Sequence, residues 1–202
     1  LEKAFGPRDW KLFCVGSTHP GEEDLVCREY ARALVTQPSW RMALVPRHAE
    51  RGAEVARILD MYHLPWQSVA PIPGTNPAPD GRCQVLLVNT TGQLMSYYRA
   101  ADLCYVGKSL AGQTGGHNII EPAIFGKAIV YGAHMENFRQ VDELFRQEEA
   151  AAVVSSDNLF FPTIQGLMAD EGRRGELGRR ARRLVEEHRG AIARTLDIVD
   201  AL

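Results

Sequence analysis

The chain has 202 residues, of which 45% are hydrophobic and 24% are charged, and these proportions are typical of a globular protein. Its formal net charge of −2 gives no electrostatic reason to expect a nucleic-acid partner, so a bound anion must be met by local groups. No apolar run approaches the roughly 18 residues that cross a bilayer, and no signal-peptide pattern is seen. The four cysteines lack metal-binding spacing, which favours a reduced cytoplasm.

Short apolar runs alternate with longer amphipathic stretches along the chain. This pattern predicts an α/β fold with a Rossmann-like, doubly wound parallel sheet of about six strands. The expected strands are Trp10–Val15, Arg41–Val45, Trp66–Val69, Gln84–Val88, Leu103–Val106 and Ala128–Tyr131, with a candidate seventh at Ala151–Val154.

Helices are expected between the strands. One carries Val26, Tyr30, Ala33 and Leu34 on one face, and another carries Val55, Ile58, Leu59 and Tyr62. Four prolines and two glycines in residues 71–82 predict a mobile surface loop. From Leu159 onward the pattern is helical, with interruptions at Gly172 and Gly190, and predicts a helical C-terminal tail.

The domain organisation expected from these elements is one domain over residues 1–202. The sequence starts at Leu1 and enters a strand-like run almost at once, from which we expect a domain excised from a longer protein.

Four unusual loops follow strands, at the edge where parallel sheets bind ligands and helix N-termini attract anions. The first is Gly16–Glu23, in which Ser17, Thr18 and His19 precede a helix start. It fits anion binding and, equally well, a helix cap with an acidic first turn. The second contains Arg47 and His48. An arginine at a strand end can bind phosphate through two parallel hydrogen bonds, but a solvent-facing helix start explains the same residues.

The third loop contains Gly92, Gln93 and Leu94, where the glycine lets backbone approach a ligand closely, although the motif alone is weak. The fourth loop is the most informative. Gly115 and Gly116 permit a turn that side chains would prevent, and His117 follows them. Asn118 with Glu121 fits a capping box, or alternatively a carboxylate placed to hold a vicinal diol.

In this order and spacing, the segments GSTHPGE, VPRHAER, TTGQLMSYY and GGHNIIEP resemble the C-terminal donor-binding domain of 3-deoxy-D-manno-octulosonic acid (Kdo) transferases of lipopolysaccharide biosynthesis. The match runs from about residue 13 to residue 194. The closing segment 187–191 is similar to the family's terminal helix region.

The resemblance implies the C-terminal half of a GT-B type glycosyltransferase that transfers Kdo from CMP-Kdo to lipid A precursor (lipid IVA). It implies no cofactor and no donor-binding metal, and it implies work at the cytoplasmic face of the bacterial inner membrane. The catalytic base belongs to the N-terminal acceptor domain, which is absent here, so no catalytic residue is expected in this chain and the domain alone should be inactive. The implied donor-binding residues are Ser17, Thr18, His19, Arg47, His48, Gly92, Gln93, Leu94, Gly115, Gly116, His117, Asn118 and Glu121.

The resemblance has three departures. The family leads us to expect an aspartate where this chain has Asn89 and an acidic residue where it has Gln93. Gln113 and Thr114 stand where an arginine or proline is usual. Each change bears on donor preference or affinity.

Two other function classes remain open from the sequence. A UDP-sugar transferase or epimerase of the same architecture would share the glycine loops and the ribose-binding glutamate. A non-catalytic module that binds a membrane or partner would explain the arginines between residues 173 and 189, which also fit a solvated helix face.

Overall fold

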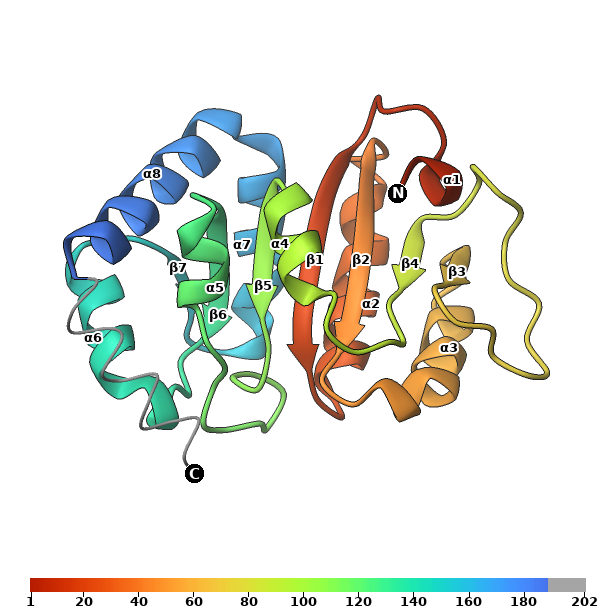
Figure 1. The fold of residues 1–202 in the computed structure, drawn as a ribbon, viewed down its shortest axis with the longest axis horizontal. Helices are drawn as coiled ribbons and strands as arrows, with labels where there is room; N and C mark the ends of the chain where they lie inside the picture. The colour runs from red at the N-terminus through yellow and green to blue at the C-terminus, as the bar shows by residue number, and fades with distance from the viewer. Residues whose placement is uncertain (189–202) are drawn as a thin grey trace.

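The structure is a computed structural model that describes residues 1–188, and its centre is a seven-stranded parallel sheet (Figure 1). The strands are β1 (Lys11–Thr18), β2 (Trp40–Pro46), β3 (Trp66–Ser68), β4 (Val85–Leu87), β5 (Leu103–Val106), β6 (Ala128–Gly132) and β7 (Ala152–Val154). Their order across the sheet is β3-β4-β2-β1-β5-β6-β7. The expected α/β fold and its strands are confirmed, the candidate seventh included, although β1 continues through the residues expected to start the first loop.

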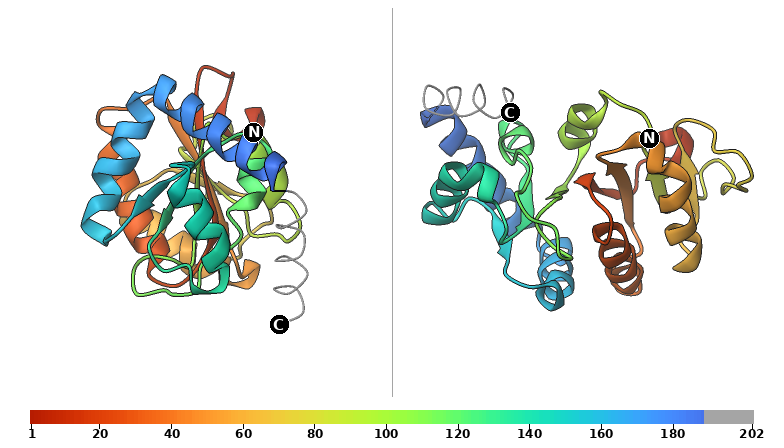
Figure 2. Two further views of the ribbon diagram at one scale, coloured as in Figure 1. Left: turned by 90° about the vertical axis from the view of Figure 1, so that its left-hand side faces the viewer. Right: turned by 90° about the horizontal axis from the view of Figure 1, so that it is seen from below.

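Helices cover both faces of this sheet (Figure 2). They are α1 (Glu2–Phe5), α2 (Glu22–Leu34), α3 (Gly52–Met61), α4 (Leu94–Ala100), α5 (Ile120–Ile124), α6 (Arg139–Gln147), α7 (Phe160–Ala169) and α8 (Glu171–Glu187), with 3₁₀ turns η1 (Ala49–Arg51), η2 (Glu136–Phe138) and η3 (Asp157–Leu159). The two helices expected from apolar spacing are α2 and α3.

Consecutive strand residues pack into two different cores. In β1, Leu12 and Cys14 pack with residues of α4, α5, α6 and α8, whereas Phe13 and Val15 pack with residues of α2, α3 and α7. Side chains of a strand alternate between the two faces, so burial of both faces requires a continuous apolar run. This explains why the strands read as unbroken hydrophobic segments.

The C-terminal helical tail is confirmed, but its break lies at a different residue. The carboxylate of Asp170 accepts a hydrogen bond from the Arg173 N–H at 2.8 Å and caps α8, whereas Gly172 lies inside the first turn. Asp170 therefore separates α7 from α8, and the second expected break, Gly190, lies outside the described residues. Farther along α8, a Cβ at Gly178 would lie 2.1 Å from the Gly126 carbonyl oxygen, so only glycine fits there.

The chain winds outward from β1 in both directions. After β1 it builds β2, β3 and β4 on one side, then crosses to β5 and builds β6 and β7 on the other. At the carboxyl ends of β1 and β5 the loops lead to helices on opposite faces of the sheet, α2 and α5. Such a switch in winding direction leaves a crevice at the sheet edge, where doubly wound folds bind ligands.

Residues 71–82 contain no helix or strand. The loop is nevertheless attached to β3, because the Ala78 N–H donates to the Trp66 carbonyl at 2.7 Å and Gln67 Nε2 donates to the Ala78 carbonyl at 2.9 Å. Its mobility stays a prediction. Within residues 1–188, no helix has both the length and the hydropathy of a bilayer-spanning segment.

Candidate functional site

Three histidines from different loops meet at the carboxyl edge of the sheet. His19 Nε2 lies 2.9 Å from His117 Nε2, with the two rings stacked at 5.1 Å between centroids, and the His48 ring stands edge-on to His19 at 5.7 Å. These residues follow β1, β2 and β5. Their meeting shows that the first, second and fourth loops singled out in the sequence share one place.

The histidine pair is neutral at neutral pH. Burial lowers the pKa of His19 to about 4 and that of His117 to about 3, and the nearby Lys108 lowers both further. Because two neutral rings share this contact, one Nε2 donates and the other accepts. The two rings therefore have a fixed relative orientation and carry no charge, although Lys108 and Arg47 are close to them.

A small cavity of about 90 Å³ lies among the loops that carry His19 and His48, and both chain neighbours of His48 line it. It is lined by Ser17, Val45, Pro46, Arg47, Ala49, Thr90, Thr91, Gly92 and Leu94. Ligand pockets commonly measure about 300 Å³ or more, so this cavity suits one anionic or hydroxylated group of a larger ligand. Arg47 lies exposed at it and makes no ion pair within residues 1–188. It is thus a cation available to a ligand.

Buried hydroxyl groups accompany the cavity. Thr90 Oγ1 and Thr18 Oγ1 are buried and have no hydrogen-bond partner in the described part of the chain. An unsatisfied buried hydroxyl is unfavourable, and Thr90 belongs to the cavity wall. A polar ligand atom in the cavity would be a natural partner for Thr90.

The glycine pair shapes the loop that carries His117. Gly115 has φ 102° and Gly116 has φ 71°, and a Cβ at Gly116 would lie 2.3 Å from Met135 Sδ. The expected turn is confirmed. However, the Gly115 N–H donates to Glu136 Oε2 at 2.6 Å and the Gly116 N–H donates to the Lys108 carbonyl at 2.8 Å. Both amides are thus engaged within the protein, so the pair positions His117 rather than offering amides to an anion.

Asn118 and Glu121 lie at the start of α5. Asn118 Oδ1 accepts the Ile120 N–H at 3.1 Å from the residue before the N-cap, Ile119, so this bond closes the turn that leads into α5. Glu121 is half-buried in the first turn, and its charge raises the pKa of Tyr98 in addition to the larger effect of burial. Their expected contact with a ribose stays a prediction.

The third loop contributes Gly92 and Leu94 to the cavity. Gly92 has φ 79° and is exposed, and Gln93 precedes α4, where its Oε1 accepts a long hydrogen bond of 3.5 Å from Tyr97. Asn89 has a structural task, since its side-chain amide accepts the Ala70 N–H and donates to the Ala70 carbonyl, both at 2.9 Å. An aspartate could make only the first of these bonds.

Sequence reasoning missed the inward orientation of Glu22 and Glu23. In the acidic first turn after Gly21 these two residues are completely buried, with 0% of either exposed. It also missed Lys108, whose charge reaches both histidines, and Thr90. The adjacent acidic residues directly after a glycine were a visible signal, but their burial depends on loops distant in sequence.

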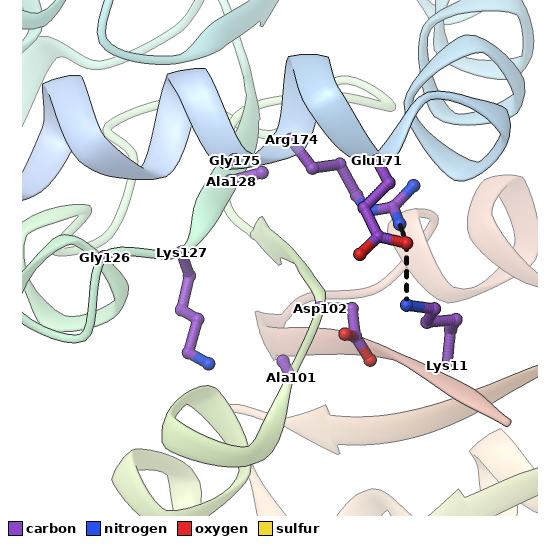
Figure 3. Close-up of a pocket in the computed structure, with 9 residues that line it drawn as sticks. All are labelled: Lys11, Ala101, Asp102, Gly126, Lys127, Ala128, Glu171, Arg174 and Gly175. Atoms are coloured by element: carbon purple, nitrogen blue, oxygen red, sulfur yellow. Dashed lines mark hydrogen bonds and ion pairs between the residues drawn. The ribbon is translucent and has the colours of Figure 1, made fainter. Parts of the chain in front are cut away.

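A second cavity lies at the opposite edge of the sheet, where β1, β5 and β6 begin (Figure 3). It measures about 190 Å³, and charged side chains from Lys11, Asp102, Lys127, Glu171 and Arg174 surround it. Most of these are engaged by the protein, since Lys11 Nζ lies 3.0 Å from Glu171 Oε2 and Asp102 Oδ2 accepts the Leu12 N–H at 2.8 Å. Ligands of parallel sheets bind at the carboxyl edge, so this cavity is not the candidate site.

The arginines of α8 are largely neutralised by carboxylates. Arg180 pairs with Glu149 at 2.8 Å and also with Glu176, and Arg182 pairs with Glu186 at 2.8 Å. Arg183 lies 3.7 Å from Glu148 and 3.8 Å from Glu187. This pairing is typical of a solvated helix face, and it weakens the interpretation of α8 as a basic membrane-binding surface.

Comparison with known proteins shows which family this chain is similar to. Over 193 residues the chain is 30% identical to the 3-deoxy-D-manno-octulosonic acid transferase of Haemophilus influenzae, covering 95% of this chain and 44% of the relative. It is also 30% identical to the enzyme of Bordetella pertussis over 194 residues, with 94% and 44% covered. The C-terminal CMP-Kdo binding domain of WaaA from Acinetobacter baumannii superposes with a TM-score of 0.79 at 26% identity, covering 88% of this chain and 90% of that domain. The chain is a relative of the Kdo transferases.

The Kdo transferase match concerns part of the enzyme. The chain spans 44% of the length of each of these two curated relatives, and the domain of WaaA to which it is similar is the C-terminal one. No protein-family model matches the sequence. Among the interpretations left open by the sequence, the glycosyltransferase class is supported, and the Kdo transferases are favoured over UDP-sugar enzymes and over a non-catalytic module.

Proposed function

We propose that this chain is the donor-binding domain of a Kdo transferase and that it holds CMP-Kdo in the crevice between β1 and β5. The observation that carries the proposal is the convergence of His19, His48 and His117 at the sheet edge where such folds bind ligands, with the Arg47 cavity among the loops of the first two. The relative in Acinetobacter baumannii is named a CMP-Kdo binding domain. Kdo donors carry a phosphate and a sugar carboxylate, which match the cations at this edge.

In the proposed arrangement, Arg47 and Lys108 face the anionic groups of the donor, and Asn118 with Glu121 holds the ribose. During transfer, an acceptor hydroxyl oxygen bonds to the anomeric carbon of Kdo while the bond from that carbon to the phosphate oxygen breaks. The acceptor proton passes to a general base, and CMP leaves with an additional negative charge. Cations preorganised around the phosphate would stabilise that charge as it develops. No metal and no cofactor take part in this proposal.

The acceptor and the base are proposed to lie in an N-terminal part of the enzyme. The acceptor is a lipid A precursor, and the place of work is the cytoplasmic face of the bacterial inner membrane. Transfer requires both substrates to be held in line. The chain by itself is therefore expected to bind donor without turnover, and formation of a Kdo-bearing lipid by this chain alone would contradict that part of the proposal.

Calorimetric titration with CMP, UMP and UDP tests the donor site. We expect CMP to bind most tightly, and Arg47→Ala and Glu121→Ala each to weaken it by about tenfold, the effect of losing one charge-assisted contact. Lys127→Ala is the matched control, because this lysine lines the cavity at the opposite edge of the sheet. Tighter binding of UDP than of CMP, or no CMP binding, would contradict the proposal.

A further inference from the structure

Two consecutive carboxylates are buried at the first turn of α2. Glu22 and Glu23 both have 0% of their surface exposed, and neither contributes to the wall of the Arg47 cavity. Burial of a charged carboxylate is unfavourable unless hydrogen bonds or an opposite charge compensate it. The partners of each residue therefore show what the burial achieves.

Glu22 accepts hydrogen bonds from both loops that carry the histidine pair. From the β5/α5 loop, the N–H groups of Lys108, Ser109 and Leu110 donate to it at 2.7, 3.0 and 3.3 Å. From its own loop, the His19 N–H donates at 3.0 Å, and Tyr105 Oη donates at 2.7 Å from β5. One side chain thus joins the backbone beside Lys108 to the backbone of His19.

These donors suit a carboxylate better than any other side chain. Lys108 has φ 65°, which turns its N–H and the next two toward one point, a backbone arrangement that normally binds an anion. The backbones of the two loops are also in direct contact at Gly107 and Ser17. No side chain fits between them, since a Cβ at Gly107 would lie 2.5 Å from the Ser17 carbonyl oxygen. A glutamine at position 22 would place an NH₂ group against N–H donors and lose part of these bonds.

Glu23 holds the neighbouring loop in the same way. Its carboxylate receives Arg51 Nη1 at 2.7 Å and Nη2 at 3.3 Å, and Arg51 also pairs with Glu54 at 2.7 Å. Arg51 ends the η1 turn that follows Arg47 and His48. The first turn of α2 is therefore attached to the loops after β2 and β5, and Glu22 makes the attachment nearest to the histidine pair.

We infer that Glu22 is a positioning residue for donor binding, which fixes the loop carrying Lys108 and His117 against the loop carrying Ser17 and His19. The inference rests on the proposed function. Glu22 is fully covered by its partners and acts through the loops that it joins. Loss of its hydrogen bonds lowers donor affinity because the cation and the histidine pair then lose their fixed separation.

The first test compares two glutamates of α2 in the same 202-residue chain. Glu22→Gln is expected to weaken CMP binding about tenfold and to accelerate amide hydrogen exchange at Lys108, Ser109 and Leu110. The control is Glu29→Gln, since Glu29 is 6% exposed and is paired with Arg28 and Arg32 farther along the helix. Glu29→Gln is expected to lower thermal stability without changing CMP affinity. A folded Glu22→Gln variant with wild-type affinity and exchange would overturn the inference.

A milder pair of variants keeps the test decisive if Glu22→Gln does not fold. Tyr105→Phe removes one hydrogen bond to Glu22. Tyr131 lies on the next strand, β6, and Tyr131→Phe removes a comparable bond of 2.8 Å to Asp142 of α6. Only Tyr105→Phe is expected to reduce CMP affinity, by roughly two- to fivefold, and to accelerate exchange at residues 108–110. Equal behaviour of the two variants would overturn the inference. Failure of the wild-type chain to bind CMP would contradict the proposed function, and amide exchange would still decide whether Glu22 fixes the loops.

Discussion

His19 and His117 are 98 positions apart in the sequence, and their Nε2 atoms lie 2.9 Å apart in the fold. Such a contact needs one ring to donate and the other to accept, so it exists only while at least one of the two Nε2 atoms carries no proton. Protonation of both rings would replace a hydrogen bond by repulsion beside Lys108.

This relationship predicts acid sensitivity. In the folded chain burial lowers the pKa of His19 from 6.5 to about 4 and that of His117 to about 3. Between about pH 6.5 and pH 4 the unfolded chain therefore binds more protons than the folded chain, and the free energy of unfolding decreases as the pH falls through this window. Thermal unfolding followed across this range should show the midpoint falling.

One variant separates the contribution of the histidines to this pH dependence from that of the other titratable residues. His117→Gln keeps a polar atom near the position of Nε2 but does not titrate, so its unfolding midpoint should change less between pH 6.5 and pH 4 than that of the wild type. Parallel curves for the two proteins would assign the acid sensitivity to other residues.

The turn before His117 predicts that alanine reduces stability by different amounts at its different glycines. Gly112 and Gly116 both have positive φ, at 79° and 71°, but a Cβ at Gly112 would meet no atom within 4 Å, whereas one at Gly116 would overlap Met135. Gly112→Ala should reduce the free energy of unfolding by about 1 kcal/mol, and Gly116→Ala by roughly 2–3 kcal/mol, because overpacking adds to backbone strain. Urea denaturation measures both, and equal losses would show that Met135 moves aside freely.

A buried tyrosine beneath the site predicts a neutral or stabilising change. Tyr98 Oη is buried without a hydrogen-bond partner in residues 1–188, and it occupies the space that a Cβ at Gly16 would need, at 2.2 Å. Tyr98→Phe removes an unsatisfied hydroxyl, so the free energy of unfolding should stay within about 0.5 kcal/mol of wild type or increase. A loss of more than about 1 kcal/mol in urea denaturation would reveal a partner for this hydroxyl.

The hydrogen bonds of Asn89 predict a loss of stability when the aspartate expected at this position is introduced. Asn89→Asp keeps the acceptor for the Ala70 N–H but places a carboxylate oxygen against the Ala70 carbonyl, so it should destabilise the chain by about 1–2 kcal/mol. Gln93→Glu is the matched control, because Gln93 makes only a long contact with Tyr97. Equal stabilities of these two variants would contradict the structural role given to Asn89.

The sequence predicted what depends on local pattern. Each buried strand needs apolar residues on both faces, so runs such as Leu103–Val106 are visible without a structure, and the amphipathic period marks α2 and α3. The four loops were found for the same reason, because they follow strands. The resemblance to Kdo transferases used their order and spacing.

What could not be predicted depends on distant pairs. Glu22 has the local pattern of an exposed helix start, and its burial follows from N–H groups that lie 86 to 88 positions later. Likewise, the Gly115 and Gly116 amides could have faced a ligand, but they are engaged by Glu136 and by the Lys108 carbonyl. The roles of Ser17, Thr18, Arg47 and Glu121 toward a donor stay predictions until binding is measured.

The contact between Gly178 and Gly126 has a consequence for how this domain can diverge. Because no side chain fits between Gly178 and the carbonyl of Gly126, α8 approaches the start of β6 by backbone contact there, and the side chains that pack farther along belong to its buried face. Substitutions among the exposed arginines and glutamates of α8 can therefore accumulate without moving the helix. In the evolution of this domain, we expect most exposed residues of α8 to vary while position 178 remains glycine.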